Sequence, residues 1–357
     1  MSNPSHIEHA GSNSSPADHE SGHVEKSGLR SWLAHLFSSH SHGHADAIRD
    51  PGLATRRGIL ALKVSLAALL VTALFQVVIV AASSSVALLA DTLHNFSDAL
   101  TAIPLWLAFR LAQRARNHRY TYGYGRAEDL AGGFIILIVL INAGLVFYES
   151  FQKMIAPRPV MNLGWVAAAA VIGFLGNEMV ALYRLRVGRE IGSAALVADG
   201  LHARTDGLTS LGVLAGVIGV WLGFPLADPI VGFAIGVAIL MIAIGAAREM
   251  WFRVMDATDP ALTEHIEAVA CSVKGVLDVH NVALRWVGHH QRGELHITVD
   301  CQLPTYESHR LAEEVRSQVF GSLPALDEMT IQVDPCACEQ SPGCQPSAHR
   351  FTRPETA

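Results

Sequence analysis

The stretch that decides the fold is "ADTLHNFSDAL", which runs from Ala90 to Leu100 in the middle of a long apolar segment. It places two aspartates, a histidine and an asparagine within eight residues, where the surrounding composition indicates a lipid bilayer. A charged side chain at the centre of a membrane helix costs about 2.5–3.5 kcal/mol on insertion scales. Such a cluster is seldom accidental, and it indicates a functional site.

The composition of the whole chain is that of a membrane protein. Half of its 357 residues are hydrophobic and 16% are charged, with a mean hydropathy of +0.31. The apolar residues gather in blocks of about 20, which is the length of a transmembrane helix. The pattern predicts six spans, at roughly 58–81, 84–110, 127–152, 163–184, 191–223 and 227–250. The net charge of -6 gives no sign of a nucleic-acid partner.

Basic residues predict the orientation of these spans. Arginines follow the second span from Arg110 to Arg119 and the fourth span from Arg184 to Arg189, whereas the connections 82–83 and 224–226 contain none. Loops rich in Arg and Lys stay on the cytoplasmic side. We therefore expect an integral membrane protein with both termini in the cytoplasm. The low complexity of the tails and the many short loops favour a bacterial inner (plasma) membrane.

The segments outside the spans differ in character. Residues 1–55 carry eight of the 18 histidines among Ser and Gly, which predicts a disordered tail that either collects metal weakly or is merely solvated. The spans form a domain at 56–256. In 257–335, "GVLDVHNVALRWVG" and "GELHITVDCQL" alternate like strands between helical segments, so the order αββαβ predicts a small, ferredoxin-like α+β domain. Residues 336–357 form a loose tail with three cysteines, Cys336, Cys338 and Cys344.

A second stretch, "ADGLHARTDGL" from Ala198 to Leu208, repeats the first as A-D-x-L-H-x-x-x-D-x-L. Residues i and i+4 share one helix face, so each histidine points the same way as its aspartate. Both pairs lie near the bilayer midplane, on helices predicted to run in opposite directions, as in an inverted repeat. Two imidazoles and two carboxylates make a tetrahedral set suited to Zn²⁺ and open to Co²⁺ or Fe²⁺. The predicted ligands are His94, Asp98, His202 and Asp206.

Other interpretations apply to single residues. One histidine or aspartate in a span could simply bond a neighbouring helix, but two matched pairs at one depth are much more specific. Asp91 and Asp199 lie three residues before each histidine, and we expect them to support the ligands or line the pathway. Glu178, in the fourth span, either lines an entry path or caps the membrane interface.

The paired H-x-x-x-D motifs resemble those of the cation diffusion facilitator family, which includes the zinc transporters, over about residues 55 to 335. The resemblance implies a homodimeric, six-span divalent-metal/proton exchanger that exports metal from the cytoplasm and dimerises through its C-terminal domain. It implies that His94, Asp98, His202 and Asp206 form the transport site, and the H-x-x-x-D form is associated with zinc. No organic cofactor is implied.

Other positions also match the family. "YTYGYGRAEDLAG" resembles the entry to its third span, although Tyr120 and Tyr124 stand where some members have histidines of an accessory site. Arg126 and Asp256 match a hinge ion pair, the alternative being that Arg126 is a simple membrane anchor. A regulatory metal site in the C-terminal domain is implied at His280, His296, His309 and Asp334, the alternative being the polar face of a surface strand.

Metal binding by these ligands requires neutral histidine and ionised aspartate, so binding displaces protons and favours metal/proton exchange. Two other functions remain open. The main substrate could be Co²⁺, Ni²⁺ or Fe²⁺, or the protein could be a membrane metal sensor without flux. An intramembrane metallo-hydrolase is disfavoured because the chain has no H-E-x-x-H motif.

Overall fold

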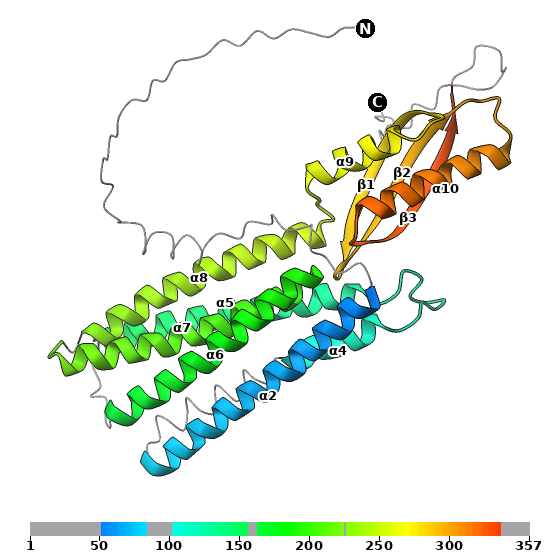
Figure 1. Cartoon of the computed structure of the whole chain (residues 1–357). Helices are drawn as coiled ribbons and strands as arrows, with labels where there is room; N and C mark the ends of the chain where they lie inside the picture. Colours follow the sequence, from blue (N-terminus) through cyan, green and yellow to red (C-terminus); the bar gives the residue numbers. More distant parts are fainter. Residues whose placement is uncertain (1–50, 84–101, 156–162, 225, 337–357) are drawn as a thin grey trace, which may run out of the picture. The chain divides into compact units, whose positions relative to one another are not determined.

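The computed structural model describes residues 51–83, 102–155, 163–224 and 226–336. Its first part is a bundle of helices (Figure 1). These are α2 (Pro51–Ser83), α4 (Ala102–Ala112), α5 (Arg126–Ile155), α6 (Leu163–Ile191), α7 (Ala194–Trp221) and α8 (Ala227–Val254). Each predicted span corresponds to one of them. The second, predicted at 84–110, is described only from Ala102 onward.

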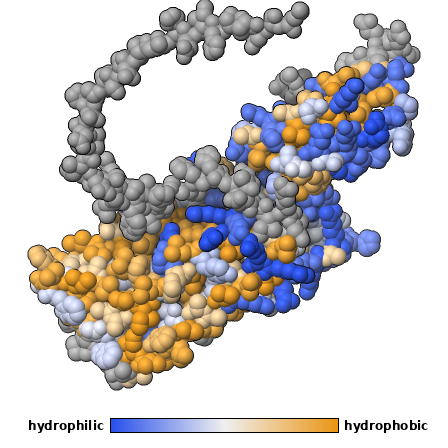
Figure 2. Space-filling model, viewed as in Figure 1, coloured by the Kyte–Doolittle hydropathy of each residue, from blue (hydrophilic) through white to orange (hydrophobic). Residues whose placement is uncertain are grey.

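Within the described residues, four helices are long and apolar enough to cross a membrane: α2, α5, α6 and α8. Helix α7 has the length for it, but its first half carries Asp199, His202, Arg204 and Asp206. The polarity that marks the predicted site thus lowers the hydropathy of the helix that carries it. Hydrophobic side chains cover much of the visible surface of the helical region (Figure 2). That surface suits contact with lipid.

The largest differences from the predicted spans are at α2 and α6. Helix α2 includes residues 51–55 of the predicted tail, and Pro51 is the first of the described residues. Helix α6 continues to Ile191 instead of ending at 184. The break before α7 comes at Gly192, whose φ is +72°, and Ser193 then caps α7 by accepting a hydrogen bond from the backbone N–H of Leu196.

Among the described helices, α6 and α7 form the most extensive pair, and α5 pairs with α8. Small residues allow α6 and α7 to approach closely. A Cβ on Gly188 would lie 2.9 Å from the backbone N of Val197, and one on Gly200 would lie 3.0 Å from the backbone N of Leu185. Membrane helices pack through such small residues because the lipid supplies no hydrophobic drive for their association.

The C-terminal part confirms the predicted αββαβ order. Its elements are α9 (Pro260–Cys271), β1 (Val276–Val287), β2 (His290–Val299), α10 (Thr305–Ser322) and β3 (Leu326–Pro335). The sheet order is β1-β2-β3, with β2 antiparallel to β1 and parallel to β3. Both helices pack on the sheet and on each other, around a buried core of Ile266, Leu295, Ile297, Val315 and Val319.

Candidate functional site

Helix α7 holds the described half of the predicted transport site. His202 is 1% exposed, and its Nδ1 lies 3.8 Å from Oδ1 of Asp206, one helical turn further on. Two ligand atoms about 2.0 Å from a tetrahedral ion would be about 3.3 Å apart, so a small adjustment lets both bind one cation. His94, Asp98 and Asp91 lie outside the described residues.

Asp199 forms an ion pair with a residue that sequence reasoning placed elsewhere. Arg184 was assigned to a basic loop, but because α6 continues to Ile191 it lies inside the helix bundle. Its Nη1 lies 3.0 Å from Oδ2 of Asp199, with side-chain exposures of 1% and 0%. Asp199 lies on α7 one turn before His202, and this ion pair connects it to α6.

A second ion pair joins the same two helices. Arg204 Nη2 donates to Oε1 of Glu178 at 2.8 Å, and its Nε donates to Oε2 at 3.4 Å. This pair is more open than the first, with side-chain exposures of 12% for Arg204 and 28% for Glu178. Two arginines on α6 and α7, neither of them predicted as a site residue, therefore bind carboxylates across the helix pair.

The structure brings Arg126 and Asp256 together. Arg126 begins α5 and donates to the Asp256 carboxylate, and it also donates to the backbone oxygen of Arg253 at 3.2 Å. Asp256 follows α8 and has a φ of +55°, which is uncommon for a residue other than glycine. Both side chains are about two-fifths exposed.

A buried network surrounds the turn between β1 and β2. His289 Nδ1 lies 2.7 Å from Oε2 of Glu128 on α5, and its Nε2 lies 3.1 Å from Oγ1 of Thr55 on α2. Gly288 donates its backbone N–H to Asp129 at 3.2 Å. The turn of the C-terminal domain is thereby hydrogen-bonded to two transmembrane helices, a contact that sequence reasoning missed. The sequence feature that marks this contact is "GHH" at residues 288–290, between the two alternating stretches that form β1 and β2.

A cavity of about 580 Å³ lies beside this turn. Its lining includes His290, Arg56, Arg116 and Arg292. Burial, and next the neighbouring His289, lower the pKa of His290 to about 4. Arg116 forms an ion pair with Glu328 on β3, with Nη2 and Oε2 2.8 Å apart. The hydrogen bond between the two side chains is the largest cause that raises the pKa of Arg116 and lowers the pKa of Glu328, and the attraction of their charges adds to it.

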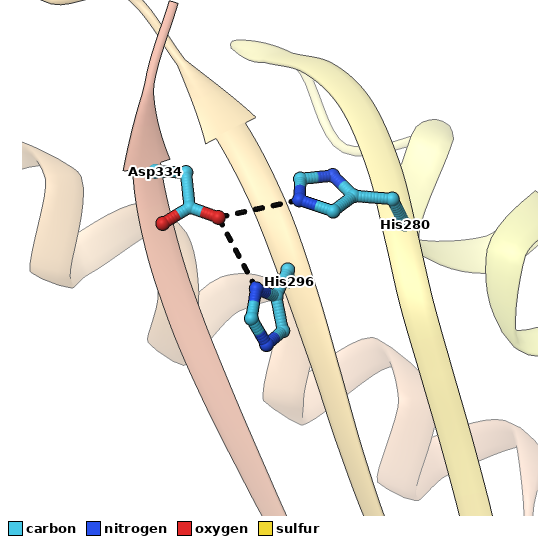
Figure 3. A group of neighbouring side chains, drawn as sticks. All are labelled: His280, His296 and Asp334. Atoms are coloured by element: carbon cyan, nitrogen blue, oxygen red, sulfur yellow. Dashed lines mark hydrogen bonds and ion pairs between the residues drawn. The ribbon is translucent and has the colours of Figure 1, made fainter. Parts of the chain in front are cut away.

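Three of the four residues matched to a regulatory metal site lie together (Figure 3). His280 Nε2 and His296 Nδ1 each lie 3.2 Å from Oδ2 of Asp334, because His280 and His296 face each other in the β1–β2 register. Although burial by itself raises the pKa of Asp334, hydrogen bonds from Gln332 and His296 hold it below its usual value. Among the described residues His309, on α10, is not part of this group.

Comparisons with known proteins identify the chain. The cation efflux transmembrane domain matches residues 62–252, and the cytoplasmic domain of cation efflux proteins matches residues 258–336. A probable cation efflux system protein of Mycobacterium tuberculosis is 47% identical over 313 residues, 88% of this chain and 94% of that protein. This chain belongs to the cation diffusion facilitator family.

More distant members of the cation diffusion facilitator family are also similar. The cation-efflux pump FieF of Serratia proteamaculans is 28% identical over 71% of this chain and 85% of its own length. The magnetosome protein MamB of a Magnetospira strain is 26% identical over 71% of this chain and 87% of its own. A solved C-terminal domain of MamM in a nickel form aligns over 22% of this chain and 100% of that domain, at 23% identity and a TM-score of 0.22.

As a cation diffusion facilitator, the protein is a membrane-spanning cation efflux transporter. Three of the groups described above contain histidine: His202 and Asp206, which lie beside the two ion pairs on α6 and α7, the His289 turn, and the His280 group. Only the first lies on helices of the transmembrane domain alone.

Proposed function

We propose that this cation diffusion facilitator exports Zn²⁺ from the cytoplasm in exchange for protons. The transport site is a tetrahedron of His94, Asp98, His202 and Asp206. The observation that carries the proposal is that the buried His202 and the partly buried Asp206 lie on one face of α7, with Nδ1 and Oδ1 3.8 Å apart. The same motif on the second span supplies the other two ligands.

The chemistry of the ligands supports the exchange of metal for protons. Zn²⁺ binds neutral imidazole and ionised carboxylate, so loading the site from the cytoplasm releases protons. Imidazole titrates near pH 6.5, so a more acidic exterior protonates the histidines and weakens their hold on the metal. The helices then return with protons in place of Zn²⁺. Arg184, bound to Asp199, holds α7 in register with α6 throughout this cycle.

The assembly is proposed to be a homodimer in the bacterial inner membrane, joined through residues 257–335, with both termini cytoplasmic. Arg126 and Asp256 form a hinge between α5 and the segment after α8. His280, His296 and Asp334 bind a regulatory cation in the C-terminal domain, where their side chains converge (Figure 3). Replacing Asp334 with Asn is expected to weaken metal control of the transport rate without abolishing transport.

Flux in proteoliposomes tests the proposal. A zinc dye and a pH dye are read together for wild type, Asp206→Asn and the control Thr209→Ala, which lies one turn beyond the site on α7. In wild type, and equally in Thr209→Ala, we expect the metal signal and the proton signal to move in opposite directions. In Asp206→Asn we expect neither signal. Normal transport by Asp206→Asn would refute the site.

The same vesicles separate the alternatives. If Co²⁺, Ni²⁺ or Fe²⁺ moves faster than Zn²⁺ at equal free concentration, that metal would be assigned as the main substrate, and the proposed ligands would be unchanged. Tight Zn²⁺ binding without any flux would favour a metal sensor. Zinc flux without a proton signal would refute the exchange.

A further inference from the structure

A second group of potential metal ligands lies at the ends of β2 and β3. Asp300 and Cys301 directly follow β2, and Cys336 directly follows β3. Their ligand atoms all lie within 4.8 Å of one another. Two sulfurs about 2.3 Å from a tetrahedral ion would be about 3.8 Å apart, so the group needs little adjustment to bind one cation.

The backbone holds this group in place. Strands β2 and β3 are parallel, and their last registered pair is Val299 with Pro335. Cys336 then donates its backbone N–H to the oxygen of Val299 at 2.8 Å. The backbone N–H of Cys301 in turn donates to Sγ of Cys336 at 3.4 Å. The register of the sheet and these backbone hydrogen bonds therefore hold the two cysteines close together, independently of their side-chain conformations.

The donor set differs from that of every other group described above. The groups of α7 and of His280 offer nitrogen and oxygen, whereas this one offers two sulfurs and one carboxylate. Thiolate ligands select soft or borderline cations such as Zn²⁺ and Cd²⁺. Asp300 Oδ1 also accepts the backbone N–H of Gln302 at 2.8 Å, which orients its carboxylate.

The oxidation state of Cys301 decides whether both sulfurs can bind. Cys301 is in a disulfide whose other half lies outside the described residues, whereas Cys336 carries a thiol. A dithiol reductant breaks that S–S bond, supplies two electrons and two protons to give two thiols, and is itself oxidised to a cyclic disulfide. The reduced thiols then release their protons as the metal binds. Thiols stay reduced in a bacterial cytoplasm, where the basic loops predict this domain to lie.

We propose that Asp300, Cys301 and Cys336 form a metal site for a soft or borderline divalent cation, and that the site becomes available when Cys301 is reduced. It is separate from the His280 group, although Asp334 of that group lies on β3 only two residues before Cys336. The site would let this domain respond to metal and to oxidation at one place.

Cobalt absorption in the purified full-length protein tests the site. The protein is reduced with dithiothreitol, freed of reductant and metal under nitrogen, and titrated with Co²⁺. Only thiolate ligation produces a sulfur-to-cobalt charge-transfer band, so the nitrogen and oxygen sites do not contribute. We expect the band in reduced wild type, its loss on oxidation with diamide, and its return on reduction. Zn²⁺ should displace Co²⁺.

Variants then locate the band. Cys336→Ser and Cys301→Ser should each lose about half of its intensity or more and weaken binding by more than about tenfold, since even outer partners of a metal site are worth 10- to 100-fold. Asp300→Asn should keep the band with weaker binding. Cys271→Ser, at an exposed thiol on α9, is the matched control and should change nothing.

Two results would overturn the proposal. One is a reduced wild type without the band. The other is a full band in Cys336→Ser that disappears when Cys338 and Cys344 are replaced, because the tail alone would then bind the metal. Asp206→Asn should show the full band, so failure of the transport site would not be mistaken for failure of this one.

Discussion

The ion pair of Arg184 and Asp199 offers a sharp test of how the transmembrane domain is built. Both side chains are almost completely buried, and Nη1 lies 3.0 Å from Oδ2. Removing one partner leaves the other charge buried without compensation, which costs about 3–5 kcal/mol. For a domain of this size, each kcal/mol lowers Tm by about 2–4 °C. Asp199→Asn should therefore lower the Tm of the protein in nanodiscs by roughly 6–20 °C.

The second ion pair of the same helices provides the control. Glu178 is 28% exposed, and an open pair contributes about 1 kcal/mol or less. Glu178→Gln should therefore shift Tm by no more than about 4 °C. Replacing both members of the buried pair, as Arg184→Met with Asp199→Leu, removes two apposed charges together and should recover most of the stability.

Transport separates a positioning role from a merely structural one. If the pair holds His202 in register, the double variant should regain Tm but still transport Zn²⁺ with a raised KM. The thermal scan and the zinc flux assay are made on the same preparations. A Tm for Asp199→Asn within about 2 °C of wild type would refute the reasoning, as would a double variant no more stable than either single one.

Three further predictions concern the ends of the helices and the C-terminal domain. Exchanging the charges of Arg126 and Asp256 in one double variant should restore the transport that Arg126→Glu alone reduces, as zinc flux would show. His289→Ala removes bonds to two transmembrane helices, so hydrogen exchange of the β1–β2 turn should rise at least tenfold. His290 has a pKa near 4 in the folded protein against about 6.5 when unfolded, so its contribution to stability is complete above pH 6.5 and is lost as the pH falls from 6.5 to 4. The loss amounts to roughly 3 kcal/mol, and His290→Gln should flatten this part of a denaturation curve measured against pH.

Local pattern was enough to predict the classes of structure. Blocks of apolar residues predicted the helices that the structure contains, and alternation predicted β1 and β2. The spacing of His202 and Asp206 placed both on one face of α7 because a helix repeats every 3.6 residues. These signals are carried by neighbouring residues, so a single sequence contains them in full.

The pairings between distant segments came only from the tertiary structure. The sequence placed Arg184 in a loop because basic residues usually mark the end of a span. In the structure α6 continues beyond Arg184 to Ile191, and the Arg184 side chain forms an ion pair with Asp199. Sequence reasoning grouped Cys336 with its tail neighbours, whereas the parallel register of β2 and β3 sets it beside Cys301. His309 matched a metal site by position, but α10 holds it outside the His280 group. Motif spacing was therefore sufficient to predict that His202 and Asp206 lie close together on one face of α7. The partners of Arg184, Cys336 and His289 depend instead on which helices and strands pack together, because no local period records contacts between distant segments.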